Sequence, residues 1–167
     1  MKREKSIELL NLAVNEELSA VHQYMYFHFR CEDQGYELLS QMFKRIAIHE
    51  MIHVEKLAER ILFLKGDIDM VPSEKVAKLV DPKDMLEKAY RQETDSINKY
   101  NAWASECSAE LDAASKILFQ GLVIEEEIHQ DQFETELDNL KKFGDKYLAL
   151  QSVERSKIIA KSPGHSD

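Results

Sequence analysis

The amino-acid sequence predicts an all-α protein: a bundle of four long helices in two antiparallel hairpins, joined by one long crossover and followed by a short C-terminal helix. Three observations support this prediction. Apolar residues recur at alternating steps of three and four along most of the chain, which is typical of helices that bury one face. The 167 residues include only 5 Gly and 3 Pro, too few for a turn-rich β protein. The first half of the chain also repeats in the second half.

A glycine follows each of the first two predicted helices. The apolar stripe of the first helix covers residues 7–31, and Gly35 comes after it. The stripe of the second covers residues 39–64 and is closed by Gly66. Glycine is common just beyond a helix end because it tolerates the left-handed conformation found there. Residues 66–80 lack a comparable stripe, so we expect them to form the connection between the two hairpins.

The third helix has a recognisable start. Asp81 is suited to cap it, and Pro82 is suited to its first position. Its apolar stripe covers residues 86–107, and the stripe of the fourth helix covers residues 119–140 and ends before a glycine. Residues 145–156 predict the short fifth helix.

Length and composition limit the classes of protein to which the chain can belong. Residues 1–156 suit a single domain, and residues 157–167 are expected to be a flexible tail. The sequence lacks an apolar run long enough for a membrane span and an apolar segment typical of a secretory signal, and it has 2 cysteines, so we expect a cytoplasmic protein with no membrane partner. The net charge is −9 without a basic cluster, which disfavours nucleic acid as a partner.

The internal repeat contains the most informative motif. A shift of 76 residues places the first half on the second, so that Glu17 falls on Glu93. Each half has one Glu-x-x-His motif and a lone glutamate 33 residues before it. The matched set is Glu17, Glu50, His53, Glu93, Glu126 and His129. A duplicated hairpin predicts a pseudo-twofold axis through the core, with equivalent side chains delivered from both halves.

These carboxylates and imidazoles predict a site for two metal ions. All four glutamates lie within apolar stripes, where unpaired carboxylates would be costly to bury and would repel one another. A structural bundle without metal would need cationic side chains at the level of these glutamates, and the stripes supply none there. A step of three residues places the members of each Glu-x-x-His motif on one helix face. Oxygen and nitrogen donors of this kind suit non-haem iron or manganese.

Two tyrosines accompany the predicted ligands. Tyr24 and Tyr100 each lie seven residues after a lone glutamate, hence on nearly the same helix face. Either they hydrogen-bond a ligand carboxylate or donate an electron, or they are ordinary core aromatics. Cys31 and Cys107 are too far along their helices to reach the same ions, so we expect them to be buried small side chains. We expect His28 to be a hydrogen-bonded core residue.

Several other polar residues remain outside this pattern. His22, His49 and His165 have no further candidate ligands around them in the sequence. Arg60 and Glu136 correspond under the 76-residue shift. They either pair across the pseudo-axis or are exposed near the end of the bundle.

With these motifs in place, the sequence resembles the bacterioferritins over nearly its whole length. The matching stretches are Glu17-Leu-Ser-Ala-Val-His-Gln-Tyr24, Glu50-Met-Ile-His53 with Glu59-Arg-Ile-Leu62, Glu93, and Glu126-Glu-Ile-His129 with Glu134-Thr-Glu-Leu137. The resemblance implies a ferritin-like bundle and a 24-subunit homo-oligomeric cage built from twofold dimers. It implies a ferroxidase that oxidises Fe(II) with dioxygen or hydrogen peroxide and stores the ferric mineral, which serves iron storage and detoxification.

The resemblance also implies roles for particular residues. The six matched side chains would hold a dinuclear non-haem iron centre, and Met51 would be the axial ligand of a haem shared between two subunits. The chain departs from some family members near Glu50. Arg45 and His49 occupy positions where those members have the histidine and aspartate of an additional iron position on the inner wall. The route of iron into the cavity is therefore left open.

A second function is compatible with the same ligands. A di-iron or di-manganese oxidoreductase of the peroxidase or catalase type would use this set without storing mineral. The two functions differ in assembly, because storage requires a cage.

Overall fold

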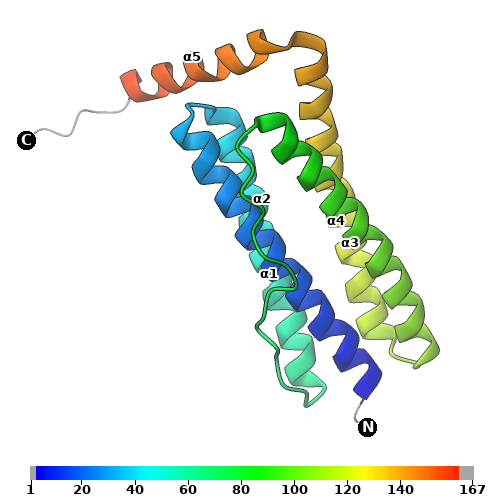
Figure 1. The fold of residues 1–167 in the computed structure, drawn as a ribbon. Coiled ribbons are helices and arrows are strands. Elements are labelled where there is room, and N and C mark those ends of the chain that lie inside the picture. Colours follow the sequence, from blue (N-terminus) through cyan, green and yellow to red (C-terminus); the bar gives the residue numbers. More distant parts are fainter. Residues whose placement is uncertain (1–2, 162–167) are drawn as a thin grey trace, which may run out of the picture.

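The structure, a computed structural model, describes residues 3–161. These residues form five helices and no strand, which confirms the all-α prediction (Figure 1). The helices are α1 (Glu4–Asp33), α2 (Glu37–Phe63), α3 (Pro82–Ala109), α4 (Ala113–Phe143) and α5 (Asp145–Lys161). The fifth helix continues beyond the predicted residue 156, so the first part of the expected tail is helical as far as Lys161. The rest of that tail, including His165, lies outside the described residues.

The predicted hairpins are present, with α1 packed on α2 and α3 packed on α4 (Figure 1). Asp81 caps α3 as expected, since its side chain accepts hydrogen bonds from the backbone N–H groups of Lys83 and Asp84. Asp112 caps α4 by accepting a hydrogen bond from the backbone N–H of Ser115. These caps satisfy helix-end donors that would otherwise have no partner.

The crossover between α2 and α3 runs back along α1 and is bonded to it at successive turns (Figure 1). The Asn11 side chain donates to the carbonyl of Asp67 at 2.9 Å. Gln23 makes two bonds to the backbone of Ala77, at 3.0 and 2.8 Å. The crossover begins at Gly66, where a Cβ atom would lie 2.6 Å from Ile7 Cγ2. The absence of a side chain at residue 66 therefore lets the chain turn closely against α1.

Helix α5 lies across one end of the bundle (Figure 1). Gln151 is fully buried there and accepts a hydrogen bond from the backbone N–H of Leu39, near the start of α2, at 3.1 Å. Arg155 donates to the carbonyl of Glu32 at the end of α1 at 2.7 Å. These bonds connect α5 to polar backbone groups at the ends of the first hairpin.

Two apolar clusters occupy the bundle core, and a polar layer lies between them in sequence along each of the four long helices. One cluster includes Leu10, Leu57 and Phe119, and the other includes Phe27 and Phe133. The clusters hold the four long helices at fixed spacing on both sides of the polar layer. None of the helices in the described part of the chain is long and apolar enough to span a membrane.

Arg60 does not pair with Glu136. Its guanidinium donates to Asp112 at 2.6 Å and to the Ser115 hydroxyl at 2.9 Å. Glu136 lines a separate pocket with Tyr147 near α5. Of the two alternatives left open by the sequence, pairing across the pseudo-axis is therefore wrong. Both residues are partly exposed, and the partner of Arg60 comes from the loop before α4.

Candidate metal centre

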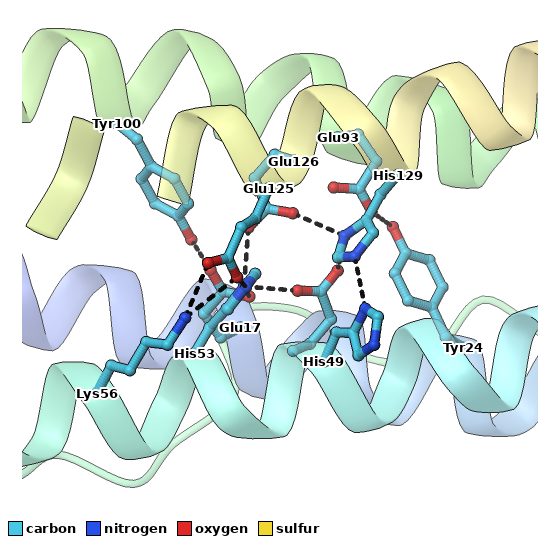
Figure 2. A network of polar contacts seen from close by, with 11 residues as sticks. Glu17, Tyr24, His49, His53, Lys56, Glu93, Tyr100, Glu125, Glu126 and His129 are labelled. Atoms are coloured by element: carbon cyan, nitrogen blue, oxygen red, sulfur yellow. Dashed lines mark hydrogen bonds and ion pairs between the residues drawn. The ribbon is translucent and has the colours of Figure 1, made fainter. Parts of the chain in front are cut away.

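The six side chains singled out by the internal repeat meet in the polar layer of the core (Figure 2). One comes from α1, two from α2, one from α3 and two from α4. Each is at most 2% exposed. The residues are Glu17, Glu50, His53, Glu93, Glu126 and His129.

These side chains form two groups of four, each with ligand atoms within 4.8 Å of one another. Glu50 and Glu126 belong to both groups and are called the shared pair below. Glu17 and His53 complete the first group, and the equivalent residues of α3 and α4 complete the second. Each group thus takes three side chains from one hairpin and one from the other. This arrangement follows the predicted pseudo-twofold relation between the hairpins. Two cation positions would share one pair of carboxylates, those of Glu50 and Glu126.

The ring nitrogens of the two histidines point into these groups. His53 Nδ1 lies 2.8 Å from Glu50 Oε2 and 3.1 Å from Glu126 Oε1. His129 Nδ1 lies 3.0 Å from Glu50 Oε1 and 3.1 Å from Glu126 Oε2. Both imidazoles therefore present the same nitrogen to the shared pair.

Several of these buried atoms lie close to one another but make no hydrogen bond of suitable geometry. Both carboxylate oxygens of Glu50, one of Glu126 and Nδ1 of His53 are in this position. Unpartnered buried polar atoms are rare and costly. Because they converge on common points and are oxygen and nitrogen donors, the donor set fits a pair of iron or manganese ions.

The protonation of the cluster indicates how strongly it needs compensating charge. Burial raises the pKa of Glu17 and Glu93 well above the ordinary range, and the charges of the shared pair raise it further. Burial alone would also raise the pKa of Glu126, but the imidazoles of His129 and His53 beside its carboxylate reverse the direction and hold it low. Burial disfavours a charged His129, yet the adjacent carboxylates of the shared pair raise its pKa to about 9. Bound protons thus offset the negative charge of the buried carboxylates, and bound cations would take over that role.

Both tyrosines hydrogen-bond a candidate ligand across the bundle (Figure 2). Tyr24 donates to Glu93, and Tyr100 donates to Glu17 Oε1 at 2.5 Å. Burial and the neighbouring carboxylates raise the pKa of both phenols well above 10, so they stay protonated. The first of the two alternatives left open by the sequence therefore holds for both residues.

Sequence reasoning missed a second set of contacts, on the outer nitrogens of the two histidines (Figure 2). Glu125 accepts a hydrogen bond from His53 Nε2 at 2.5 Å and is held by Lys56 at 2.9 Å. His49 Nδ1 lies 3.2 Å from His129 Nε2, so the expectation that His49 lacks neighbouring candidate ligands was wrong.

The repeat contains the signal that would have found these two residues. Each immediately precedes one Glu-x-x-His motif, so the 76-residue shift places His49 on Glu125. Both line a pocket of about 290 Å³ together with Lys56 and His129. Partners of this kind fix which ring nitrogen of a ligand histidine faces the metal.

The remaining sequence-selected residues lie away from the centre. Met51 is 55% exposed on α2, which agrees with the expected outward orientation. Cys31 and Cys107 are buried and free. His28 is buried and within hydrogen-bond distance of the Ser40 hydroxyl, 2.9 Å from Nδ1. The expectations for the cysteines and for His28 are thus confirmed.

The helical bundle and its buried carboxylate–histidine cluster define a ferritin-like protein, and a family model of the ferritin-like domain matches residues 7–143. A bacterioferritin of Desulfovibrio desulfuricans is 35% identical over 148 residues, which cover 89% of this chain and 83% of that protein. A bacterioferritin of Brucella melitensis is 38% identical over 144 residues, 84% and 88% of the two chains. The chain belongs to the bacterioferritin family.

A solved structure agrees with this placement. The crystal structure of the Desulfovibrio desulfuricans bacterioferritin, which describes its diiron site in different catalytic states, matches with a TM-score of 0.88 and 34% sequence identity. The match covers 90% of this chain and 88% of that one. The fold class predicted from the sequence is therefore confirmed by both the helices and the comparison.

Proposed function

We propose that this protein oxidises Fe(II) to Fe(III) at a dinuclear centre within each subunit and stores the ferric product as mineral in a hollow homo-oligomeric cage. The observation that carries the proposal is the pair of buried four-ligand groups that share Glu50 and Glu126. The bacterioferritin relatives, and the diiron site of the solved one, support iron as the metal.

The side chains suit the oxidation for electrostatic reasons. The four glutamates of the two groups, when ionised, carry as much negative charge as two ferrous ions carry positive charge. Loss of one electron from each ion increases its positive charge, and the carboxylates stabilise that product more than the reactant. The shared pair is placed to contact both ions, while Glu17 and Glu93 each serve one. Dioxygen or hydrogen peroxide would take the electrons.

A single substitution tests the centre. We expect Glu126→Ala to abolish rapid Fe(II) oxidation while leaving helix content unchanged, because it removes a ligand from both groups and relieves repulsion in the metal-free core. Glu127→Ala is the matched control, since Glu127 is the next residue of α4 and is exposed. Stopped-flow absorbance after mixing with Fe(II) measures the rate, and circular dichroism measures the helix content. Oxidation at the parent rate in Glu126→Ala would refute the ligand assignment.

Storage requires a cage, for which the resemblance implies 24 subunits in a homo-oligomer made of twofold dimers. Light scattering of the purified protein tests the assembly, and the iron retained per cage after Fe(II) oxidation tests storage. A monomer or simple dimer that still oxidises Fe(II) would instead support a di-iron or di-manganese oxidoreductase without storage.

We place the protein in the cytoplasm, because reduced cysteines such as Cys31 and Cys107 are typical of that compartment.

We further propose that Met51 is the axial ligand of a haem shared across a twofold axis. Its side chain is 55% exposed, with Ile48 also exposed one turn earlier on α2, and a thioether is a suitable ligand for haem iron. When bound, the haem would carry electrons into or out of the cage. Met51→Leu should remove the haem absorbance, while Met70→Leu, at the 58% exposed methionine of the crossover, should retain it. Equal haem content in the two variants would refute the assignment.

A further inference from the structure

An aromatic pair connects the metal centre with the protein surface in the second half of the chain. Tyr100 is fully buried and donates a hydrogen bond to Glu17 at 2.5 Å. Its ring centroid lies 5.5 Å from that of Trp103. Trp103, the only tryptophan of the chain, is partly exposed. An oxidisable ring in contact with a candidate ligand thus touches a second oxidisable ring that reaches solvent.

The first half of the chain lacks this arrangement, although it is built from the same repeat. The 76-residue shift places Tyr100 on Tyr24 but places Trp103 on Phe27. Tyr24 has ring contacts with Phe43 and Phe133, at 6.2 and 5.4 Å between centroids. Phenylalanine is far harder to oxidise than tyrosine or tryptophan, so these two rings do not relay an electron to Tyr24.

Tyr26, another oxidisable ring of the first half, contacts the ring of Phe27, with 6.2 Å between their centroids. Phe27 itself is fully buried. The duplication therefore provides an internal comparison: among residues 3–161, the contact between two oxidisable tyrosine or tryptophan rings is the one in the second half.

We propose that Trp103 and Tyr100 supply an electron to the dinuclear centre when it holds only one ferrous ion. This inference rests on the proposed ferroxidase function. Hydrogen peroxide accepts two electrons, which a filled centre draws from two Fe(II) ions. A half-filled centre supplies one, and the indole supplies the other: H2O2 + Fe2+ + TrpH + H+ → 2 H2O + Fe3+ + Trp•.

The hydrogen bond from Tyr100 to Glu17 places the phenol directly against a candidate ligand. Tyr100 passes one electron to the centre and receives one from Trp103, so it ends in its starting state. A second ferrous ion at the surface then restores the indole: Trp• + H+ + Fe2+ → TrpH + Fe3+. The sum is the oxidation of two Fe(II) ions by one hydrogen peroxide, without an unpaired electron left on the protein.

A rapid-freeze experiment on the whole protein tests the relay. Metal-free protein is loaded anaerobically with one Fe(II) per subunit, mixed with one equivalent of hydrogen peroxide, frozen and examined by electron paramagnetic resonance. The parent should give a tryptophan-type radical. Trp103→Phe should give only a tyrosyl signal, and the double variant Trp103→Phe/Tyr100→Phe should lose both. Tyr26→Phe, in the other half, should give the parent signal.

Persistence of the parent signal in Trp103→Phe, or absence of any organic radical in the parent, would overturn the relay. The reaction of the parent with two Fe(II) per subunit separates this failure from failure of the proposed function. If that reaction proceeds while no radical forms in the half-loaded protein, the relay is wrong and the ferroxidase stands. If it does not proceed, the ferroxidase itself is wrong.

A second measurement excludes direct attack of peroxide on the exposed indole. With peroxide in excess over Fe(II), Trp103 should accumulate oxygen, detected by peptide mass spectrometry. Tyr100→Phe should protect Trp103, because it breaks the connection to the centre without changing the exposure of the indole. Equal oxidation of Trp103 in the parent and in Tyr100→Phe would overturn the proposal.

Discussion

Individual residues make the two halves of the metal centre chemically different. Glu125 and His49 occupy equivalent places in the repeat and contact the outer nitrogens of His53 and His129. A carboxylate increases the electron density of the imidazole that it accepts from, whereas a neutral imidazole does so less. Burial and the neighbouring His129 also lower the pKa of His49, which favours its neutral form. The two ion positions should therefore differ in affinity.

Glu125→Ala should lower the affinity for one of the two metal ions by about 10- to 100-fold, the usual effect of losing a hydrogen-bond partner of a ligand histidine. The reason is that Glu125 orients only His53, the histidine of the first four-ligand group. Spectroscopic titration of the metal-free protein with Co(II) resolves the two equivalents, and Glu127→Ala is the exposed control. Loss of both equivalents to the same extent, or of neither, would contradict the asymmetry.

At the scale of the helices, two glycines should respond to alanine in opposite directions. A Cβ at residue 66 would lie 2.6 Å from Ile7, so Gly66→Ala should destabilise the fold by about 1 to 3 kcal/mol. Gly121 lies inside α4 with nothing within 4 Å of an added Cβ, and Gly121→Ala should stabilise by about 0.5 to 1 kcal/mol. Urea unfolding midpoints compare the two. If both variants shifted the urea midpoint equally in the same direction, the crossover would be able to move away from α1 and accept the added side chain.

The cap of α4 should make stability depend on pH. Burial tends to raise the pKa of Asp112, but hydrogen bonds from Ser115 and the charge of Arg60 hold it below the ordinary value of an aspartate. A lowered carboxyl pKa stabilises the fold above the unfolded-state pKa, about 3.9, and this contribution is lost as pH falls through the folded-state pKa. Asp112→Asn should therefore be less stable than the parent near pH 7, with the difference shrinking below about pH 4.

Urea unfolding of Asp112→Asn at a series of pH values measures this dependence. Glu110→Gln, two residues away and exposed, should follow the parent at every pH. A constant difference between Asp112→Asn and the parent would assign the effect to lost capping geometry rather than to the charge.

Helices and candidate ligands were predictable because both follow from the helical period. A glutamate in an apolar stripe, such as Glu17 or Glu93, must face the core whichever helix packs against it. Contacts between helices were less accessible, since they depend on rotations and spacing that no single stripe contains. Pairing with the pseudo-symmetric Glu136 was one of two alternatives for Arg60, yet its guanidinium bonds Asp112 from a loop. The length of α5 was also underestimated, because its last turns have little burial to mark them.

For the molecule as a whole, metal binding should be coupled to stability. Ions that bind the assembled ligand cluster, and not the unfolded chain, stabilise the fold by about 2.7 kcal/mol at a concentration one hundred times the dissociation constant. Saturating Co(II) or Zn(II) should therefore raise the melting temperature of the metal-free protein. Glu50→Ala/Glu126→Ala, which removes the shared pair, should lose this increase. An equal increase in both proteins would place the stabilising ions elsewhere.

The division of ligands between the hairpins has a consequence for fragments of the chain. A protease cut within the crossover would separate a piece that ends after α2 from a piece that begins with α3. The first would lack Glu126 and the second would lack Glu50, so neither would contain a complete four-ligand group. Bound ions would then join the two pieces in place of the peptide chain. We expect the nicked protein to stay together during gel filtration in mild denaturant when metal is bound, and to separate after chelation.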